Sequence, residues 1–306
     1  MPLSIFGFQA MWSPYLIGVI LFLTVLYFLI TVKWRTDFKE SEPLKKREAI
    51  NFVISMILLY IVMGSPVDLM AHIMFTMHMV QMALLLLLIP IFLIQGIPNW
   101  LWKYVIELPY IKPVFHFMTK PMFALAFFVA LFSFYHIPMI LDYIKLNETL
   151  HGLYTLLLFV SALFMYWPLI NSVEGQPRMK DLHKVGYIIG NAVLITPACA
   201  LIIFASSPFY ATYTDGELWM KAMELCVPVS TLAGLSLSGP ELFTNMDPMY
   251  DQQLGGIIMK IIQEIIFAAV LGKVFVKWYR NEQENAEEIT QKALLERQQL
   301  NANQYN

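Results

Sequence analysis

The 306-residue chain is poor in charged residues. Only 14% of its residues are Asp, Glu, Lys or Arg, well below the roughly 25% of an ordinary soluble domain, whereas 58% are hydrophobic. The mean hydropathy is +0.61. These values exclude the one large or two small soluble domains that the length alone would allow. They predict an all-α integral membrane protein.

Several functional classes are excluded by what the chain lacks. A net charge of −2 gives no basic surface for nucleic acid, so no nucleic-acid partner is expected. Two cysteines, Cys199 and Cys226, are too few for a disulfide framework or an all-cysteine metal site. The chain has no Gly-Xaa-Ser-Xaa-Gly, no His-Glu-Xaa-Xaa-His and no glycine-rich phosphate loop. We therefore expect a protein that is not an enzyme.

Long apolar runs make up most of the chain, and a spanning helix needs about 20 such residues. The sequence predicts a seven-transmembrane helix bundle over residues 1–278, followed by a polar tail at 279–306. The expected spans cover residues 14–33, 50–66, 72–96, 121–141, 147–171, 184–207 and 255–277.

The loops between these spans differ in basic charge. Seventeen Lys and Arg residues fall in the first, third and fifth loops and the C-terminal end, including Arg178, against two in the alternate loops, Lys145 and Lys221. The positive-inside rule then places the N-terminus outside and the C-terminus in the cytoplasm of a bacterial plasma membrane. An eighth span at 218–238 would violate this bias, so we expect an interfacial or re-entrant segment there. Residues 97–120, rich in Trp, Tyr and Pro, are expected at the cytoplasmic interface.

Four of the six histidines fall near the outer ends of the expected spans. His78, His136 and His151 lie about 6–9 Å below the outer ends of three neighbouring spans, at 1.5 Å of rise per residue. His72 lies above them. A single core histidine usually just hydrogen-bonds a backbone carbonyl, but three at one depth favour a shared metal site.

Methionines accompany these histidines. Met74, His78 and Met82 are spaced four residues apart and would share one face of a continuous helix. Thioether and imidazole groups together suit Cu(I) better than hard cations. We therefore expect copper, held by His78, His136 and His151 with Met82, and with His72 and Met74 at the entry.

Acidic residues near the same boundary could support such a site. Asp142, Asp251 and Asp68 are candidates for orienting or gating its ligands. Lys260 and Glu264 stand four residues apart in the last span and are expected to pair within the membrane.

Five short motifs in this chain resemble those of a known family. In chain order they are Ser65-Pro66-Val67-Asp68, His78-Met79-Val80-Gln81, Gly96-Ile97-Pro98, His136-Ile137-Pro138 and Asp251-Gln252-Gln253-Leu254-Gly255-Gly256. The chain resembles, from about Trp12 to Trp278, the CtaG-type cytochrome c oxidase assembly proteins of Gram-positive bacteria. Asp142 and His151 also fit this pattern.

The resemblance implies a plasma-membrane assembly factor for haem–copper oxidase. It would deliver copper to the site beside the high-spin haem of oxidase subunit I, after receiving it from an extracytoplasmic donor protein. Two positions depart from the family pattern. Met82 stands where a second histidine is frequent, an exchange that Cu(I) tolerates. Lys260 stands where tryptophan is frequent, which leaves the role of that part of the last span open.

Other functions remain open on the sequence alone. The protein could be a metal-free scaffold for oxidase maturation, a copper or proton-coupled transporter using Lys260 and Glu264, or a membrane enzyme with bound haem or metal. Gly186 and Gly190, four residues apart, would allow close helix packing and a homodimer.

Overall fold

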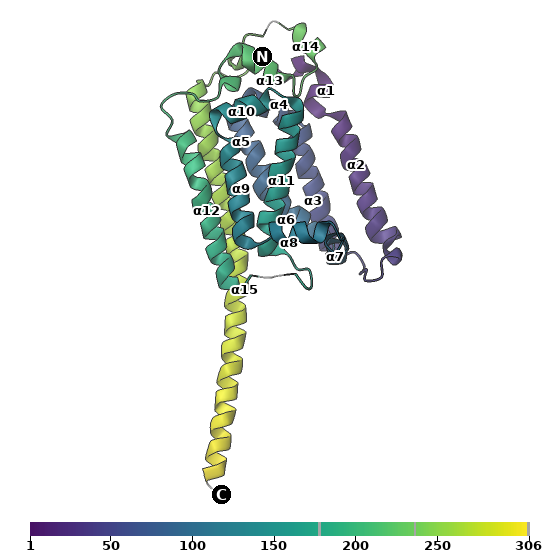
Figure 1. The fold of residues 1–306 in the computed structure, drawn as a ribbon, viewed down its shortest axis with the longest axis vertical. Helices are drawn as coiled ribbons and strands as arrows, with labels where there is room; N and C mark the ends of the chain where they lie inside the picture. Colours follow the sequence, from purple (N-terminus) through teal and green to yellow (C-terminus); the bar gives the residue numbers. More distant parts are fainter. Residues whose placement is uncertain (177–178, 236, 305–306) are drawn as a thin grey trace.

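The computed structural model contains helices but no strand among the residues it describes, 1–176, 179–235 and 237–304. Arg178 of the charge count and residue 236 of the expected outer segment lie outside these residues. The long helices form an upright bundle (Figure 1): α2 (Pro14–Phe28), α3 (Lys46–Gly64), α5 (Phe75–Ala83), α6 (Ile89–Gly96), α9 (Pro121–Tyr135), α11 (Glu148–Ile170), α12 (Asp181–Ile203) and α15 (Pro248–Gln304).

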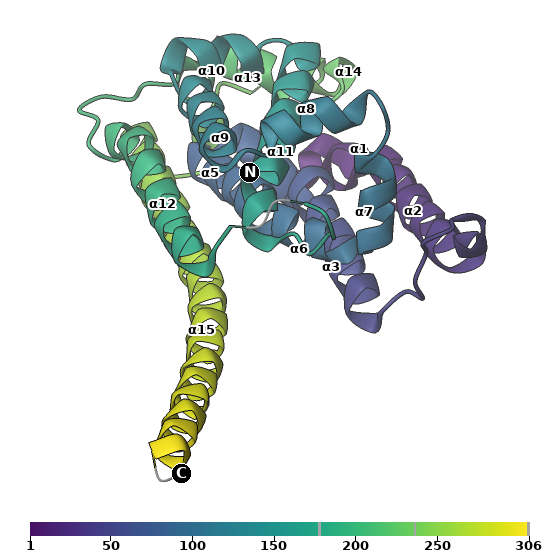
Figure 2. The same ribbon diagram turned by 60° about the horizontal axis from the view of Figure 1, so that its bottom comes forward.

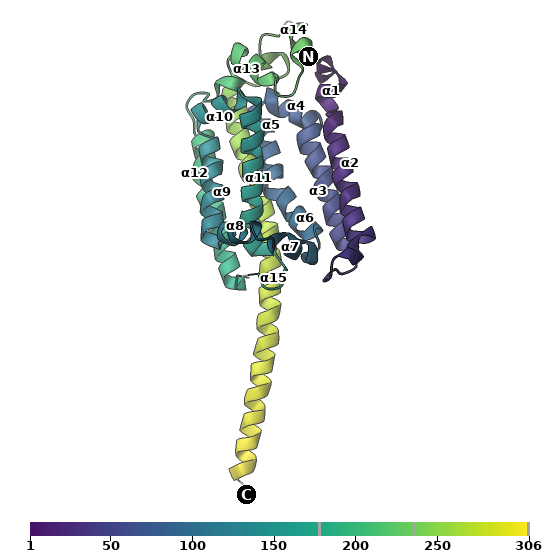
Figure 3. The same ribbon diagram turned by 45° about the vertical axis from the view of Figure 1, so that its right-hand side comes forward.

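Short helices cover the two ends of this bundle. One end, called here the α10 end, carries α1 (Gly7–Trp12), α4 (Pro66–Ile73), α10 (Pro138–Lys145), α13 (Gly216–Met223) and α14 (Val229–Ala233). The other, called here the α8 end, carries α7 (Asn99–Ile106) and α8 (Ile111–Met118). The N-terminus lies at the α10 end and the C-terminus far beyond the α8 end (Figures 1 and 3).

Six stretches are long and apolar enough to cross a membrane. They are Leu3–Lys33, Lys46–Gly64, Phe75–Gly96, Glu148–Ile170, Asp181–Ile203 and Pro248–Leu294. The remaining expected span corresponds to α9, which has 15 residues and would reach about 22 Å against a hydrocarbon core of about 30 Å. Counting α9 together with α8, from which it is bent by 81°, gives seven.

The structure starts the span expected at 72–96 at Phe75, after a break in the helix. Pro66 occupies the first turn of α4, and the Ser65 hydroxyl caps that helix by accepting from the Val67 amide. The backbone then becomes extended at Met74 (φ −125°, ψ 135°) before α5 starts. His72 therefore lies in a helix of its own, and Met74, His78 and Met82 do not share one continuous helical face.

The expected span 121–141 is wrong at its end. α9 stops at Tyr135, and His136 takes a non-helical conformation (φ −87°, ψ 5°). Pro138 then starts the separate helix α10, since the residue before a proline is disfavoured in the helical region. The sequence motif His136-Ile137-Pro138 is thus a corner between two helices.

The outer segment 218–238 does not cross the bundle. Its helices α13 and α14 lie over the α10 end (Figure 3). There they pack with α1 and α4 in a small apolar cluster that includes Phe6, Leu69, Ile73, Trp219 and Met223. This confirms that the segment is not an eighth span.

The long helix α15 ends the chain. It has 57 residues, begins before the expected last span and continues as a helix through the polar tail. Its first half packs against α5 and α12, and its second half extends away from the bundle (Figures 1 and 2).

A close contact between α3 and α6 depends on Gly96. A Cβ atom at this position would stand 2.5 Å from the Phe52 backbone nitrogen, and the Tyr27 hydroxyl donates to the Gly96 carbonyl at 2.8 Å. Gly96→Ala should therefore lower the free energy of unfolding in detergent by about 3 kcal/mol, since the backbone of α3 must move. Gly18→Ala in α2, where a Cβ atom meets nothing within 4 Å, is the control and should be neutral or stabilising. Equal melting of the two variants would contradict the close packing.

Candidate functional site

Four histidines gather under the short helices of the α10 end. His72 lies in α4, His78 in α5, His136 at the end of α9 and His151 in the first turn of α11. The ring centroids of His72 and His151 are 5.7 Å apart, and those of His78 and His136 are 6.2 Å apart. The sequence placed three of these imidazoles at one level with His72 above them, and the structure brings the four together as two pairs.

One ring nitrogen, Nε2, is buried without a partner in three of these histidines. His72, His78 and His136 are 5%, 2% and 5% exposed, and each Nε2 atom has no hydrogen-bond partner among the described residues. A buried polar atom without a partner costs about 1–3 kcal/mol, so three in one place call for a ligand.

Hydrogen bonds at the opposite ring nitrogen fix the tautomer of two of them. His72 Nδ1 lies 2.9 Å from the Asp68 carbonyl oxygen, and His136 Nδ1 lies 2.8 Å from the Phe132 carbonyl oxygen. A carbonyl oxygen can only accept, so Nδ1 carries the proton and Nε2 presents a lone pair. An imidazole held in this way is typical of a metal ligand.

The arrangement is open rather than a closed metal cage. Among the described residues no group of three or more His, Cys, Asp or Glu side chains is placed to hold a metal ion. The predicted set of His78, His136 and His151 is therefore split, with His151 next to His72. A pair of imidazoles can still bind Cu(I), a soft ion that accepts few ligands; two bonds of about 2 Å separate ring centroids by roughly 6 Å.

The two candidate methionines differ in their surroundings. Met82, one turn beyond His78 in α5, is 1% exposed and belongs to the main apolar core. Met74 is half-buried in the break between α4 and α5 and packs against the small apolar cluster at the α10 end.

The three candidate aspartates hold the backbone around the histidines. The Asp251 carboxylate accepts from the amides of Phe75 and Thr76 at 2.7 and 3.1 Å, so it caps α5 from another helix. The Asp142 carboxylate accepts from the amides of Ala211 and Thr212 at 2.9 and 3.0 Å, and from the Thr212 hydroxyl at 2.7 Å.

Asp68 is the candidate aspartate that contacts a histidine through its backbone. Its carboxylate accepts from the Gln81 side chain at 2.6 Å, while its backbone carbonyl holds His72. No carboxylate oxygen of the three aspartates has an imidazole partner among the hydrogen bonds of the described residues.

A buried lysine, which the sequence reasoning counted as a loop residue, lies beside the histidines. Lys145 is 1% exposed and donates from Nζ to the Tyr213 hydroxyl at 2.7 Å. That hydroxyl donates in turn to the carbonyl of Ala71, the neighbour of His72, at 2.9 Å. The tyrosine ring also lies 6.2 Å from the ring of His78.

A signal for this burial exists in the sequence. Leu141, Ile144 and Lys145 are spaced to share one face of a short helix after Pro138, and all three are buried. A helical reading of residues 138–145 would have placed Lys145 on the apolar face.

Burial shifts the pKa values of three ionisable side chains in α4 and α10. Burial, followed by the charges of Lys145 and His151, lowers the pKa of His72 well below its usual range. Burial lowers the pKa of Lys145 to about 7 and raises the pKa of Asp68 to about 7. His72 is therefore neutral at physiological pH, which keeps the Nε2 lone pair free of protons.

Lys260 and Glu264 lie elsewhere, on α15. Their side chains pair at 2.7 Å, and Lys260 also donates to the Thr196 hydroxyl of α12 at 2.8 Å. The pair joins two helices away from the histidines.

The chain was compared with known proteins. Residues 25–281 match the family described as cytochrome c oxidase caa3 assembly factor (Caa3_CtaG). No match was found among the curated proteins or the solved structures.

Proposed function

Because the chain belongs to the family of cytochrome c oxidase caa3 assembly factors, we propose that it carries Cu(I) to the oxidase through its paired histidines. The observation that carries this proposal is the burial of three imidazole Nε2 atoms without partners. His78 and His136 form the principal pair, and His72 and His151 form the second. Met82 is the soft ligand of the first pair.

The open geometry suits a carrier. An ion that must be handed on needs exchangeable coordination, and two imidazoles bind less tightly than a closed set of four ligands. The acceptor in this proposal is the copper site beside the high-spin haem of oxidase subunit I. The donor is an extracytoplasmic protein, which requires the α10 end to face outward from a bacterial plasma membrane, as the charge of the loops predicts.

The test counts copper on the purified full chain in detergent under reducing conditions, by competition with a coloured Cu(I) chelator. The wild type should retain Cu(I), and His78→Ala/His136→Ala should lower the affinity at least tenfold. His116→Ala/His183→Ala is the matched control, since His116 hydrogen-bonds the Lys112 carbonyl at the α8 end and His183 is exposed. Equal copper retention by both double variants would refute the ligand assignment.

A second function, a metal-free scaffold for the oxidase subunit, is favoured by one observation: no group of three His, Cys, Asp or Glu side chains is placed to hold a metal ion among the described residues. The two functions separate in cells that lack the native protein. The copper carrier predicts that the His78→Ala/His136→Ala variant yields oxidase with haem but without copper beside the high-spin haem. The scaffold predicts normal oxidase with the same variant.

A further inference from the structure

A hollow of about 550 Å³ opens between helices at the α8 end, and the four histidines lie at the opposite end of the bundle. α3 and α12 begin there, and α6 and α11 end there, while α15 passes through the same level. The ends of apolar helices mark the boundary between hydrocarbon and water. The hollow therefore lies at the depth of lipid head groups.

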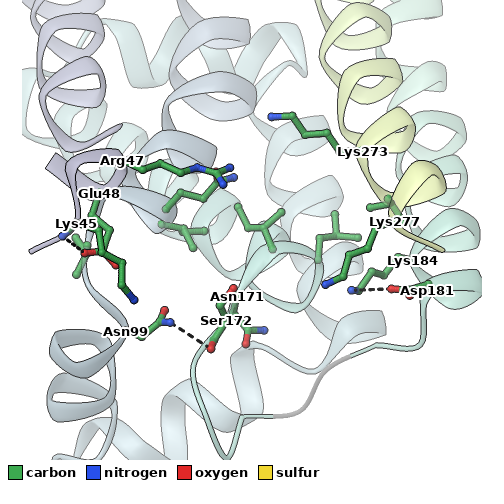
Figure 4. A pocket seen from close by; sticks show the side chains of 16 residues that line it. Lys45, Arg47, Glu48, Asn99, Asn171, Ser172, Asp181, Lys184, Lys273 and Lys277 are labelled. Carbon is green, nitrogen blue, oxygen red and sulfur yellow. Dashed lines mark hydrogen bonds and ion pairs between the residues drawn. The ribbon is translucent and has the colours of Figure 1, made fainter. Parts of the chain in front are cut away.

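Three cationic side chains from two helices, α3 and α15, line this hollow. Arg47 of α3 extends into it from one side, and Lys273 and Lys277 of α15 extend into it from the other (Figure 4). Lys273 and Lys277 stand four residues apart, so they share one face of α15. None of these three side chains has an ion-pair or hydrogen-bond partner among the interactions of the described residues.

The acidic side chains in the lining are already engaged. Glu48 accepts from the Lys45 backbone amide at 3.0 Å, and Asp181 pairs with Lys184 at 3.2 Å. With Lys45 and Lys184 included, five cations and two carboxylates line the hollow, which leaves a net charge of +3.

Apolar side chains share the lining with this charge. Ile94 at the end of α6, Leu169 at the end of α11 and Val274 of α15 contribute hydrocarbon surface between the cations. A small inorganic anion needs no such surface. A ligand with a phosphate group and acyl chains fits both parts of the lining.

We propose that the hollow binds the head group of an anionic phospholipid, with Arg47, Lys273 and Lys277 around its phosphate. Basic pockets between membrane helices at the cytoplasmic boundary recognise such head groups, and guanidinium and ammonium groups are the usual phosphate donors. The lipid would join α3 to the α12–α15 pair at the α8 end. This site is independent of the copper proposal.

The test is native mass spectrometry of the full chain from an uncharged detergent, titrated with dioleoyl phosphatidylglycerol or dioleoyl phosphatidylcholine. The wild type should retain phosphatidylglycerol at least tenfold more strongly than phosphatidylcholine. Arg47→Gln/Lys273→Gln/Lys277→Gln should remove this preference. Millimolar inorganic phosphate and glycerol phosphate should fail to displace the lipid, which distinguishes a phospholipid from a free phosphate.

The matched control removes the same charges from the loop after α2, as Lys33→Gln/Arg35→Gln/Lys39→Gln, and should keep the preference. The charge-preserving variant Arg47→Lys/Lys273→Arg/Lys277→Arg should also keep it, which separates loss of charge from loss of fold. Equal loss in the control triple variant, or displacement of the lipid by free phosphate, would overturn the proposal. So would equal retention of the two lipids by the wild type.

Discussion

Replacing Asp251 by alanine should lower the free energy of unfolding by about 4 kcal/mol, the largest stability effect we expect from a single polar side chain here. The buried carboxylate accepts from the amides of Phe75 and Thr76, 176 and 175 residues away in the chain. Without it, two buried N–H groups at the start of α5 lose their acceptors. Chemical unfolding in mixed micelles would measure the change.

The same variant should also weaken Cu(I) binding. His78 lies on the first turn of α5, directly after the amides that Asp251 holds, so fraying of this turn displaces its imidazole. The control is Asp247→Ala, one turn earlier on the chain, whose exposed carboxylate caps the Met249 amide. This control should cost only about 1 kcal/mol and leave copper binding unchanged. If the two aspartate variants lose equal stability, Asp251 is an ordinary surface cap and the argument fails.

The bundle was predictable from the sequence because its dominant signal is local. A run of about 20 apolar residues determines a crossing helix almost without reference to the rest of the chain. The expected spans at 14–33, 50–66, 147–171 and 184–207 agree with helices in the structure to within a few residues.

The breaks at Met74 and His136 were missed for a different reason. The local sequence predicts one helix over residues 72–82. In the structure the helix is interrupted at Met74, and Asp251 offsets the cost by accepting from the amides that start α5. No local sequence pattern connects Asp251 to α5. At His136 a local signal did exist in Pro138, but the apolar residues that follow it obscured the end of α9.

The proximity of the histidines was predictable from the sequence, but their pairing was not. Depth along each expected span brought His78, His136 and His151 to one level. Depth alone could not show that His72, which lies in a separate helix, is next to His151, or that His78 is next to His136. Pairing depends on how the helices are rotated about their axes, which tertiary packing decides.

The short helix α10 explains why the Lys145 side chain lies beside the histidine rings. α10 turns its apolar face inward and carries Lys145 with it, and the Tyr213 hydroxyl links the ammonium group to α4. A buried cation near a site for another cation lowers the affinity of that site. In the proposed carrier role this would help release, since a tightly held ion is not handed on.

Lys145→Met should therefore stabilise the fold and tighten Cu(I) binding together. The unfolded chain holds the lysine proton up to a pKa of about 10.4, whereas burial lowers the pKa in the folded chain to about 7. At pH 7 this difference costs about 4 kcal/mol, and after loss of the Tyr213 hydrogen bond the variant should gain about 3 kcal/mol. Removing the nearby positive charge should raise the Cu(I) affinity about tenfold, and copper transfer to the oxidase should slow accordingly.

The pH dependence of the free energy of unfolding tests, without copper, whether Lys145 destabilises the folded chain. Between pH 7 and about 10.4 the unfolded chain binds more protons at this position, so wild-type stability rises with pH and the advantage of Lys145→Met shrinks. Unfolding of the metal-free variant and wild type at pH 7 and pH 9.5 would show this convergence. Lys221→Met, an exposed lysine of α13 at the same end, should differ little from wild type at either pH. If the difference in free energy of unfolding between Lys145→Met and wild type stays constant with pH, Lys145 keeps its proton near neutrality in the folded chain. The argument that its burial weakens copper binding would then be wrong.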